Sequence, residues 1–145
     1  MKIHSLTESI VNKYQTRNPF DIIKQRNIIL VYAPLIDVRG FYQYFQRNNI
    51  IYINENLSEH GKTLVCAHEL GHMFLHKKAN AVYMDTHTCF NTDKYENEAN
   101  IFAAELLIPD EAIEENYDLT TKQLSRVLGY EQALIELKLK NYHKC

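Results

Sequence analysis

The apolar and polar positions along the chain predict helices near both ends and a small sheet between them. Apolar runs rich in β-branched and aromatic residues are typical of strands, and they occur at residues 28–32, 40–46 and 50–54. The last two runs flank Arg47-Asn48-Asn49, which indicates a hairpin turn. Residues 79–93 are predicted to form a long loop. Helices are expected at residues 5–14 and 19–26, and a third helix is expected to end near residue 77. Further helices are expected from residue 95 to the residue before Pro109, in a short segment that starts at 110, near 121–128 and at 131–141.

The helix that ends near residue 77 is apolar on nearly every face between residues 64 and 75, which is typical of a buried helix. It contains His68-Glu69-Leu70-Gly71-His72. Histidines four residues apart lie on one face, roughly 6 Å apart along the axis, so both imidazoles can reach one cation. Glu69 then lies beside the ion, where a carboxylate can move a proton from water to a leaving amine. The alternative is a pair of core histidines that donate to backbone carbonyls.

A metal site needs further ligands, and two candidates follow in the chain. His76 is four residues past His72, but along a straight helix it would lie about 12 Å from His68, too far for one ion. A histidine near the end of a helix is the alternative for His76. Glu98 lies near the start of a second helical run, where it adjoins a stripe of apolar positions that packs on a neighbour. A His-His-Glu set with an open fourth position is the pattern of catalytic zinc. The stripe consists of Ala99, Phe102, Ala103, Leu106 and Leu107.

The two segments, His68 to His72 and Glu96 to Pro109, agree in type, order and separation with a known family. They resemble the ImmA/IrrE metallo-endopeptidases. The resemblance implies that Glu98 is the third ligand. It also implies an α+β, zincin-like fold, with a small antiparallel or mixed sheet packed on the histidine-bearing helix and a helical C-terminal part. The substrate implied is a helix-turn-helix repressor of a phage, a mobile element or a stress operon.

The chain departs from related enzymes in one position. Thermolysin-like relatives often carry an aspartate four residues after the glutamate ligand, where it orients a histidine, but position 102 is Phe. Glu105 could take that role, or it could be a solvated surface residue. Tyr83, His87 and Tyr95 lie in or beside the expected long loop, and nothing in the sequence assigns one of them to an oxyanion.

Composition and charge fit one small enzyme of 145 residues, a single metallopeptidase domain in which 118–145 forms a helical subdomain. The net charge of −2 gives no electrostatic footprint for nucleic acid. Residues 119–134 have a helix-turn-helix pattern, but the second helix carries Glu131 and Glu136, which suit packing better than phosphate binding. No apolar run could span a bilayer or serve as a signal peptide, and three cysteines suit a reducing cytoplasm.

The sequence thus predicts a cytoplasmic zinc metallo-endopeptidase. One Zn²⁺ is expected on His68, His72 and Glu98, with Glu69 as the proton carrier, although Mn²⁺ or Fe²⁺ would also suit these donors. A strand of the hairpin at residues 40–54 is expected to pair with the extended substrate, unless its edge is covered. The alternative function is a non-catalytic, metal-containing binding module that sequesters a repressor or a toxin partner. Neither nucleic acid nor membrane is expected as a partner, and the oligomeric state stays open.

Overall fold

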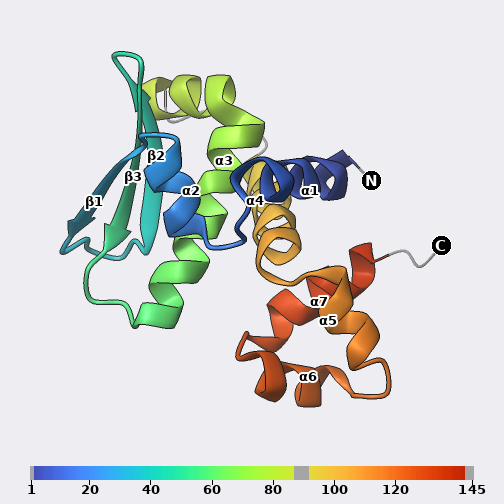
Figure 1. The fold of residues 1–145 in the computed structure, drawn as a ribbon. Helices are drawn as coiled ribbons and strands as arrows, with labels where there is room; N and C mark the ends of the chain where they lie inside the picture. Colours follow the sequence, from blue (N-terminus) through green and yellow to red (C-terminus); the bar gives the residue numbers. More distant parts are fainter. Residues whose placement is uncertain (1, 87–91, 143–145) are drawn as a thin grey trace.

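The computed structural model of the protein describes residues 2–86 and 92–142, with only the backbone described for 77–86 and 92. Its α+β architecture confirms the predicted class (Figure 1). A three-stranded sheet lies against α3, and helices occupy the other side of α3. The elements are α1 (Lys2–Tyr14), α2 (Pro19–Gln25), β1 (Ile29–Ala33), β2 (Gly40–Phe45), β3 (Asn48–Asn54), α3 (Glu59–Thr86), α4 (Thr92–Leu107), α5 (Asp110–Glu115), α6 (Thr121–Leu128) and α7 (Gln132–Asn141).

The sheet is mixed, with the strand order β1-β3-β2. β1 runs parallel to β3, and β2 runs antiparallel to it. The predicted hairpin turn at residues 47–49 is wrong in position, because Asn48 and Asn49 already pair with β2. The turn is made instead by Gln46 and Arg47, with φ of 49° and 66°. Positive φ at both central residues gives the backbone twist that matches the two strands, so a tight turn here outweighs the usual preference for asparagine.

The metal-binding helix predicted to end near residue 77 continues as α3 to Thr86. The expected loop at 79–93 is therefore wrong at both ends, because residues 79–86 belong to α3 and residues 92–93 to α4, while residues 87–91 lie outside the described chain. Residues 77–86 contain neither glycine nor proline, so nothing in them ends a helix. The helix departs from helical geometry at His76, with φ −131° and ψ 25°. The extra length is therefore joined to the predicted helix through a break at this histidine.

α3 and α4 approach each other closely in the centre of the molecule. The predicted apolar stripe of α4 is confirmed by Ala99, Phe102 and Ala103, all of which are fully buried. On the α3 side lies Gly71, where an added Cβ would come within 3.1 Å of Ala99 Cα and 3.1 Å of Phe102 Cβ. Absence of a side chain at residue 71 thus permits the helices to pack at this distance.

A buried polar cluster joins α4 to both ends of the chain. Glu105, 1% exposed, accepts from Lys138 of α7 at 2.9 Å and contacts His4 of α1 at 2.8 Å. Lys138 is fully buried and also donates to Asp110 at 2.6 Å. Both expectations for Glu105 are therefore wrong, because it neither orients a histidine of α3 nor lies in solvent. The ammonium of Lys138 already supplies the positive charge that these carboxylates need.

The helical C-terminal part begins with α6. Thr120 and Gln123 form a capping box at its start, and Gly129, with φ 83°, ends it. Leu124 of α6 and Leu134 of α7 are buried in the core. These two helices fall within residues 118–145, whose standing as a subdomain stays a prediction.

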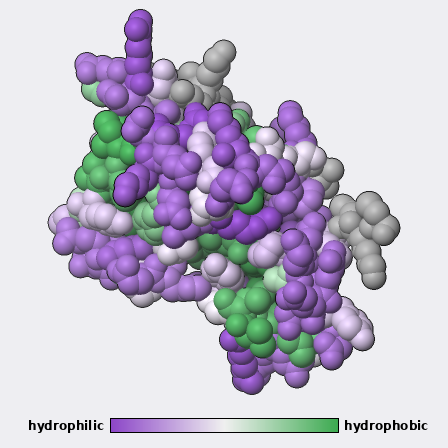
Figure 2. Space-filling view, viewed as in Figure 1, coloured by the Kyte–Doolittle hydropathy of each residue, from purple (hydrophilic) through white to green (hydrophobic). Residues whose placement is uncertain are grey.

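The surface combines a mostly polar face with apolar patches over the sheet and over the C-terminal helices (Figure 2). Exposed apolar side chains on and near β1 and β2 include Ile29, Ile36, Val38 and Phe45. Within residues 2–86 and 92–142, no helix has the length and apolar character needed to cross a membrane.

Candidate metal centre

Three side chains from two helices converge on one point. His68 and His72 extend from α3, and Glu96 extends from α4, so that one ligand atom of each lies within 4.8 Å of the other two. His68 Nε2 is 2.9 Å from Glu96 Oε1, and His72 Nε2 is 2.8 Å from Glu96 Oε2. The four-residue spacing of the histidines thus places both rings on one carboxylate, as a shared cation would require.

Glu98, the third ligand implied by the family resemblance, lies elsewhere. Its Oε1 is 2.8 Å from His76 Nε2. Two residues along a helix correspond to a rotation of roughly 200°, so Glu96 and Glu98 of α4 cannot face the same point. Among the described residues, the group with metal-ligand spacing consists of His68, His72 and Glu96, and Glu98 is not a member of it.

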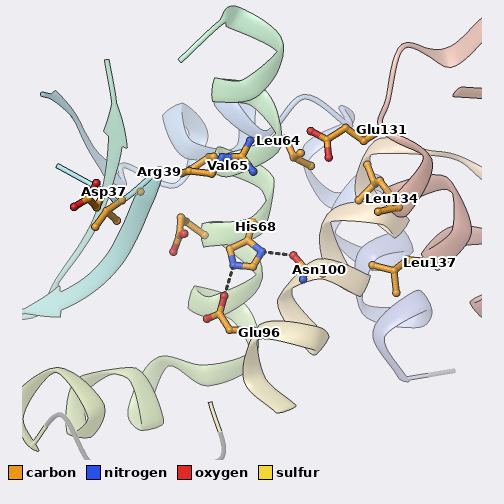
Figure 3. Close-up of a pocket in the computed structure, with 14 residues that line it drawn as sticks. Asp37, Arg39, Leu64, Val65, His68, Glu96, Asn100, Glu131, Leu134 and Leu137 are labelled. Carbon is orange, nitrogen blue, oxygen red and sulfur yellow. Dashed lines mark hydrogen bonds and ion pairs between the residues drawn. The ribbon is translucent and has the colours of Figure 1, made fainter. Parts of the chain in front are cut away.

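Asn100 also belongs to the site, and sequence reasoning missed it. Its Oδ1 lies 2.7 Å from His68 Nδ1, on the side of the ring away from Glu96 (Figure 3). Asn100 follows Glu96 by four residues, so the orienting residue absent at position 102 is present once the count starts from Glu96. Phe102 instead packs in the core, with its ring 5.8 Å from the ring of Phe74. The asparagine fixes the orientation of His68, as such outer contacts commonly do.

The facing atoms of His68 and Glu96 need a proton or a metal ion between them. An amide oxygen only accepts, so the Asn100 contact places the proton of His68 on Nδ1 and leaves the Nε2 lone pair facing Glu96. Two acceptors at 2.9 Å repel each other unless a proton or a metal ion lies between them. The close contacts of the His68 and His72 rings with its carboxylate lower the pKa of Glu96 strongly. Burial lowers the pKa of His68, but the carboxylates of Glu96 and Glu69 outweigh it and the pKa is raised. The two nitrogens and one carboxylate therefore fit Zn²⁺, with Mn²⁺ and Fe²⁺ as alternatives.

Glu69 is buried next to this group, with 6% of its surface exposed. Burial raises the pKa of its carboxyl, while His68 and His72 lower it to a smaller extent. Among the described residues, no side chain or backbone group forms a hydrogen bond with this carboxylate. A buried carboxylate without such a partner is costly, and it is suited to hold a water molecule.

The site opens into a cleft of about 500 Å³. Its walls come from the segment that leads into β2, from α3 and α4, and from α7 (Figure 3). Arg39 lies on the sheet side, whereas Leu134 and Leu137 of α7 lie opposite. Gly40 of β2 also lines the cleft. At Gly40 an added Cβ would come within 2.6 Å of both Tyr52 O and Val65 Cγ1, so this glycine allows the edge strand to approach α3.

Of the remaining candidates, His76 and Tyr95 lie next to each other. His76 does not belong to the group of His68, His72 and Glu96, which agrees with the prediction that it lies too far from His68 to share an ion. Its ring lies 4.5 Å from the ring of Tyr95. His87 lies outside the described residues, as does the side chain of Tyr83.

Comparison with known proteins matches this chain to a peptidase family. The family model described as "IrrE N-terminal-like domain" matches residues 23–139, which include all the candidate ligands. The chain is 40% identical over 147 residues to "Uncharacterized immunity region protein 2" of Bacillus phage phi105, across 97% of this chain and 93% of that protein. It is 33% identical over 110 residues to "Metallopeptidase ImmA" of Bacillus subtilis (strain 168), across 74% of this chain and 64% of that protein.

Proposed function

The chain belongs to the ImmA/IrrE family of metallopeptidases, and from this premise we propose that it is a zinc-dependent endopeptidase. The observation that carries the proposal is the convergence of His68, His72 and Glu96 in an open cleft beside the buried Glu69. Two imidazoles and one carboxylate leave a coordination position free, which distinguishes catalytic zinc sites from structural ones.

The protein's own residues would share the work of peptide hydrolysis. Bound zinc would supply Lewis acidity, which acidifies water and polarises the substrate carbonyl. Glu69 would take a proton from the attacking water and pass it to the leaving amine. A pKa raised by burial suits this role, because a base works best when its pKa lies closer to the working pH. Asn100 would keep His68 in the tautomer that binds metal through Nε2.

The substrate would bind as an extended strand along β2. β3 lies in the middle of the sheet, so of the two hairpin strands only β2 has an edge without a strand partner among the described residues. Gly40, at the start of β2, lines the same cleft as Glu69. Backbone hydrogen bonds to such an edge would hold a peptide in a fixed register beside the site.

The substrate class follows from the relatives rather than from the geometry. One relative is named an immunity region protein and the other a metallopeptidase. Together with the family resemblance, these names support a helix-turn-helix repressor of a phage, a mobile element or a stress operon as substrate. Such a protein would meet the enzyme in the cytoplasm.

Incubation of the zinc-loaded protein with the repressor encoded beside it tests the proposal. Cleavage is expected with the wild type and absent with Glu69→Gln, which should still bind zinc. Glu59→Gln is the matched control, because Glu59 lies on the same helix but is almost fully exposed (93%). Intact repressor in the presence of the zinc-loaded wild type would reject the peptidase. Biological activity that survives Glu69→Gln would favour the non-catalytic binding module.

A further inference from the structure

His72 has a second set of contacts on the side of its ring that faces away from Glu96. Its Nδ1 lies 3.1 Å from His76 Nδ1, and His76 Nε2 lies 2.8 Å from Glu98 Oε1. Both rings are buried, with 7% of His72 and 5% of His76 exposed. The three side chains form a continuous row that ends at His72 Nε2, 2.8 Å from Glu96.

We propose that His76 and Glu98 are positioning residues, which hold His72 in the tautomer and orientation that bind the metal. The proposal rests on the proposed metal site and deepens it. It gives Glu98 a defined role beside the site rather than on the ion.

The direction of each hydrogen bond follows from Glu98, which stands at the end of the row opposite His72 Nε2. The Glu98 carboxylate only accepts, so His76 Nε2 must carry a proton and donate it. In a neutral ring this leaves a lone pair on His76 Nδ1, which accepts from Nδ1–H of His72. His72 Nε2 is then free of a proton and can bind a cation. With the opposite order, His76 Nε2 and Glu98 would face each other as two acceptors at 2.8 Å.

The surroundings hold His76 in place from two further sides. α3 leaves helical geometry at this residue, with φ −131° and ψ 25°. The ring of Tyr95, from α4, lies 4.5 Å from the imidazole at an interplanar angle of 48°. A nearly buried ring with fixed neighbours restricts the ring that it contacts, so the orientation of His72 is set before a metal binds.

The two metal-binding histidines are thus supported in parallel ways from one helix. Asn100 of α4 contacts Nδ1 of His68, and Glu98 of the same helix acts on His72 through His76. Each imidazole presents Nε2 to Glu96. An additional partner of this kind typically changes metal affinity by about 10–100-fold.

The zinc affinity of Glu98→Ala, measured with Zn²⁺ in competition with a chromophoric chelator, tests the proposal. We expect the variant to bind zinc about 10–100-fold more weakly than the wild type. Asp93→Ala is the control, because this substitution removes the same negative charge as Glu98→Ala, but from the exposed start of α4. Its affinity should stay within about three-fold of the wild type. Equal affinities of the Glu98→Ala variant and the wild type would overturn the proposal.

Nitrogen-15 NMR of the histidine rings in the zinc-loaded wild type provides a readout that a purely structural role would not move. We expect a proton on Nδ1 of His72 and on Nε2 of His76, and loss of the single His76 tautomer in Glu98→Ala. A proton on His76 Nδ1 in the wild type would overturn the proposal without any variant. Failure of the wild type to bind zinc would instead overturn the metal site itself, and this proposal with it.

Discussion

A methyl group added at Gly71 should disturb the metal site from within the helix contact. Gly71 lies between the two candidate histidine ligands on α3. A Cβ there would be 3.1 Å from Ala99 Cα, 3.1 Å from Phe102 Cβ and 3.2 Å from Ala99 O. Carbon atoms pack best at about 3.5–4.0 Å, so α4 would have to move away by roughly 0.4 Å. Two of these three atoms, Ala99 Cα and Ala99 O, belong to the backbone, so no rotation of a side chain can relieve the close contacts.

The expected effects on stability and on metal binding differ in size. Replacement of glycine by alanine inside a helix stabilises by about 1 kcal/mol, whereas overpacking costs about 1–3 kcal/mol. Gly71→Ala should therefore lower the free energy of unfolding of the metal-free protein by no more than about 2 kcal/mol. Metal–ligand bonds tolerate deviations of about 0.2 Å, so a shift of Glu96 with α4 should weaken zinc binding about 10-fold or more. Metal binding is thus expected to suffer more than folding.

Zinc titration against a chelator and urea unfolding of the metal-free protein measure the two quantities. Gly61→Ala is the matched control, because it lies on the same helix and its Cβ would meet mainly the side chains of Ser58 at 3.3 Å and Leu57 at 3.4 Å. That variant should bind zinc like the wild type. If Gly71→Ala also binds zinc with wild-type affinity, the close contact of α3 and α4 does not control the ligand geometry, and the reasoning is refuted.

Three further variants test other parts of the molecule. Lys138→Met should lower the free energy of unfolding by about 3–5 kcal/mol in urea titrations, because it leaves two carboxylates without their fully buried cation; a loss below about 1 kcal/mol would contradict this. Asn100→Leu should weaken zinc binding about 10–100-fold, whereas Asn100→Asp should preserve zinc binding because its carboxylate accepts the same hydrogen bond from His68. Equal zinc affinities of the two variants would count against a role for the contact between Asn100 and His68. Burial raises the pKa of Glu69 above its ordinary value of 4.5, so the metal-free wild type should lose more stability than Glu69→Gln as pH rises from the ordinary value through the folded pKa. Unfolding free energies at about pH 4 and pH 8 measure this, and a constant difference between the two proteins would argue against it.

Most elements of the fold could be predicted from local patterns. The strands and the amphipathic or buried helices follow the periods of two and 3.6 residues that the sequence displays. The errors lie where the pattern carries no information. Residues 77–86 continue α3 because no breaker stops it, and the turn at Gln46 and Arg47 is set by strand pairing rather than by turn residues.

The candidate metal site was predictable on α3 and ambiguous on α4. The spacing of His68 and His72 specifies a shared ligand point, because both residues lie on one continuous helix. The Glu96-Asn97-Glu98 segment offers two carboxylates, and the choice depends on how α4 is rotated against α3. That rotation is a tertiary property. Asn100, four residues after Glu96, was the available signal, and it becomes meaningful only when Glu96 is taken as the ligand.

The arrangement of the site follows from where the two helices touch. Ala99 packs against Gly71, which lies between His68 and His72 in the sequence and directly precedes His72. The three polar residues of α4 that reach histidines, Glu96, Glu98 and Asn100, lie on both sides of Ala99 in sequence. Because they surround the contact point, one helix can provide a ligand and support two rings without a loop. The same packing that allows α4 to approach α3 therefore sets the ligand distances, which explains why small residues occupy both sides of the contact.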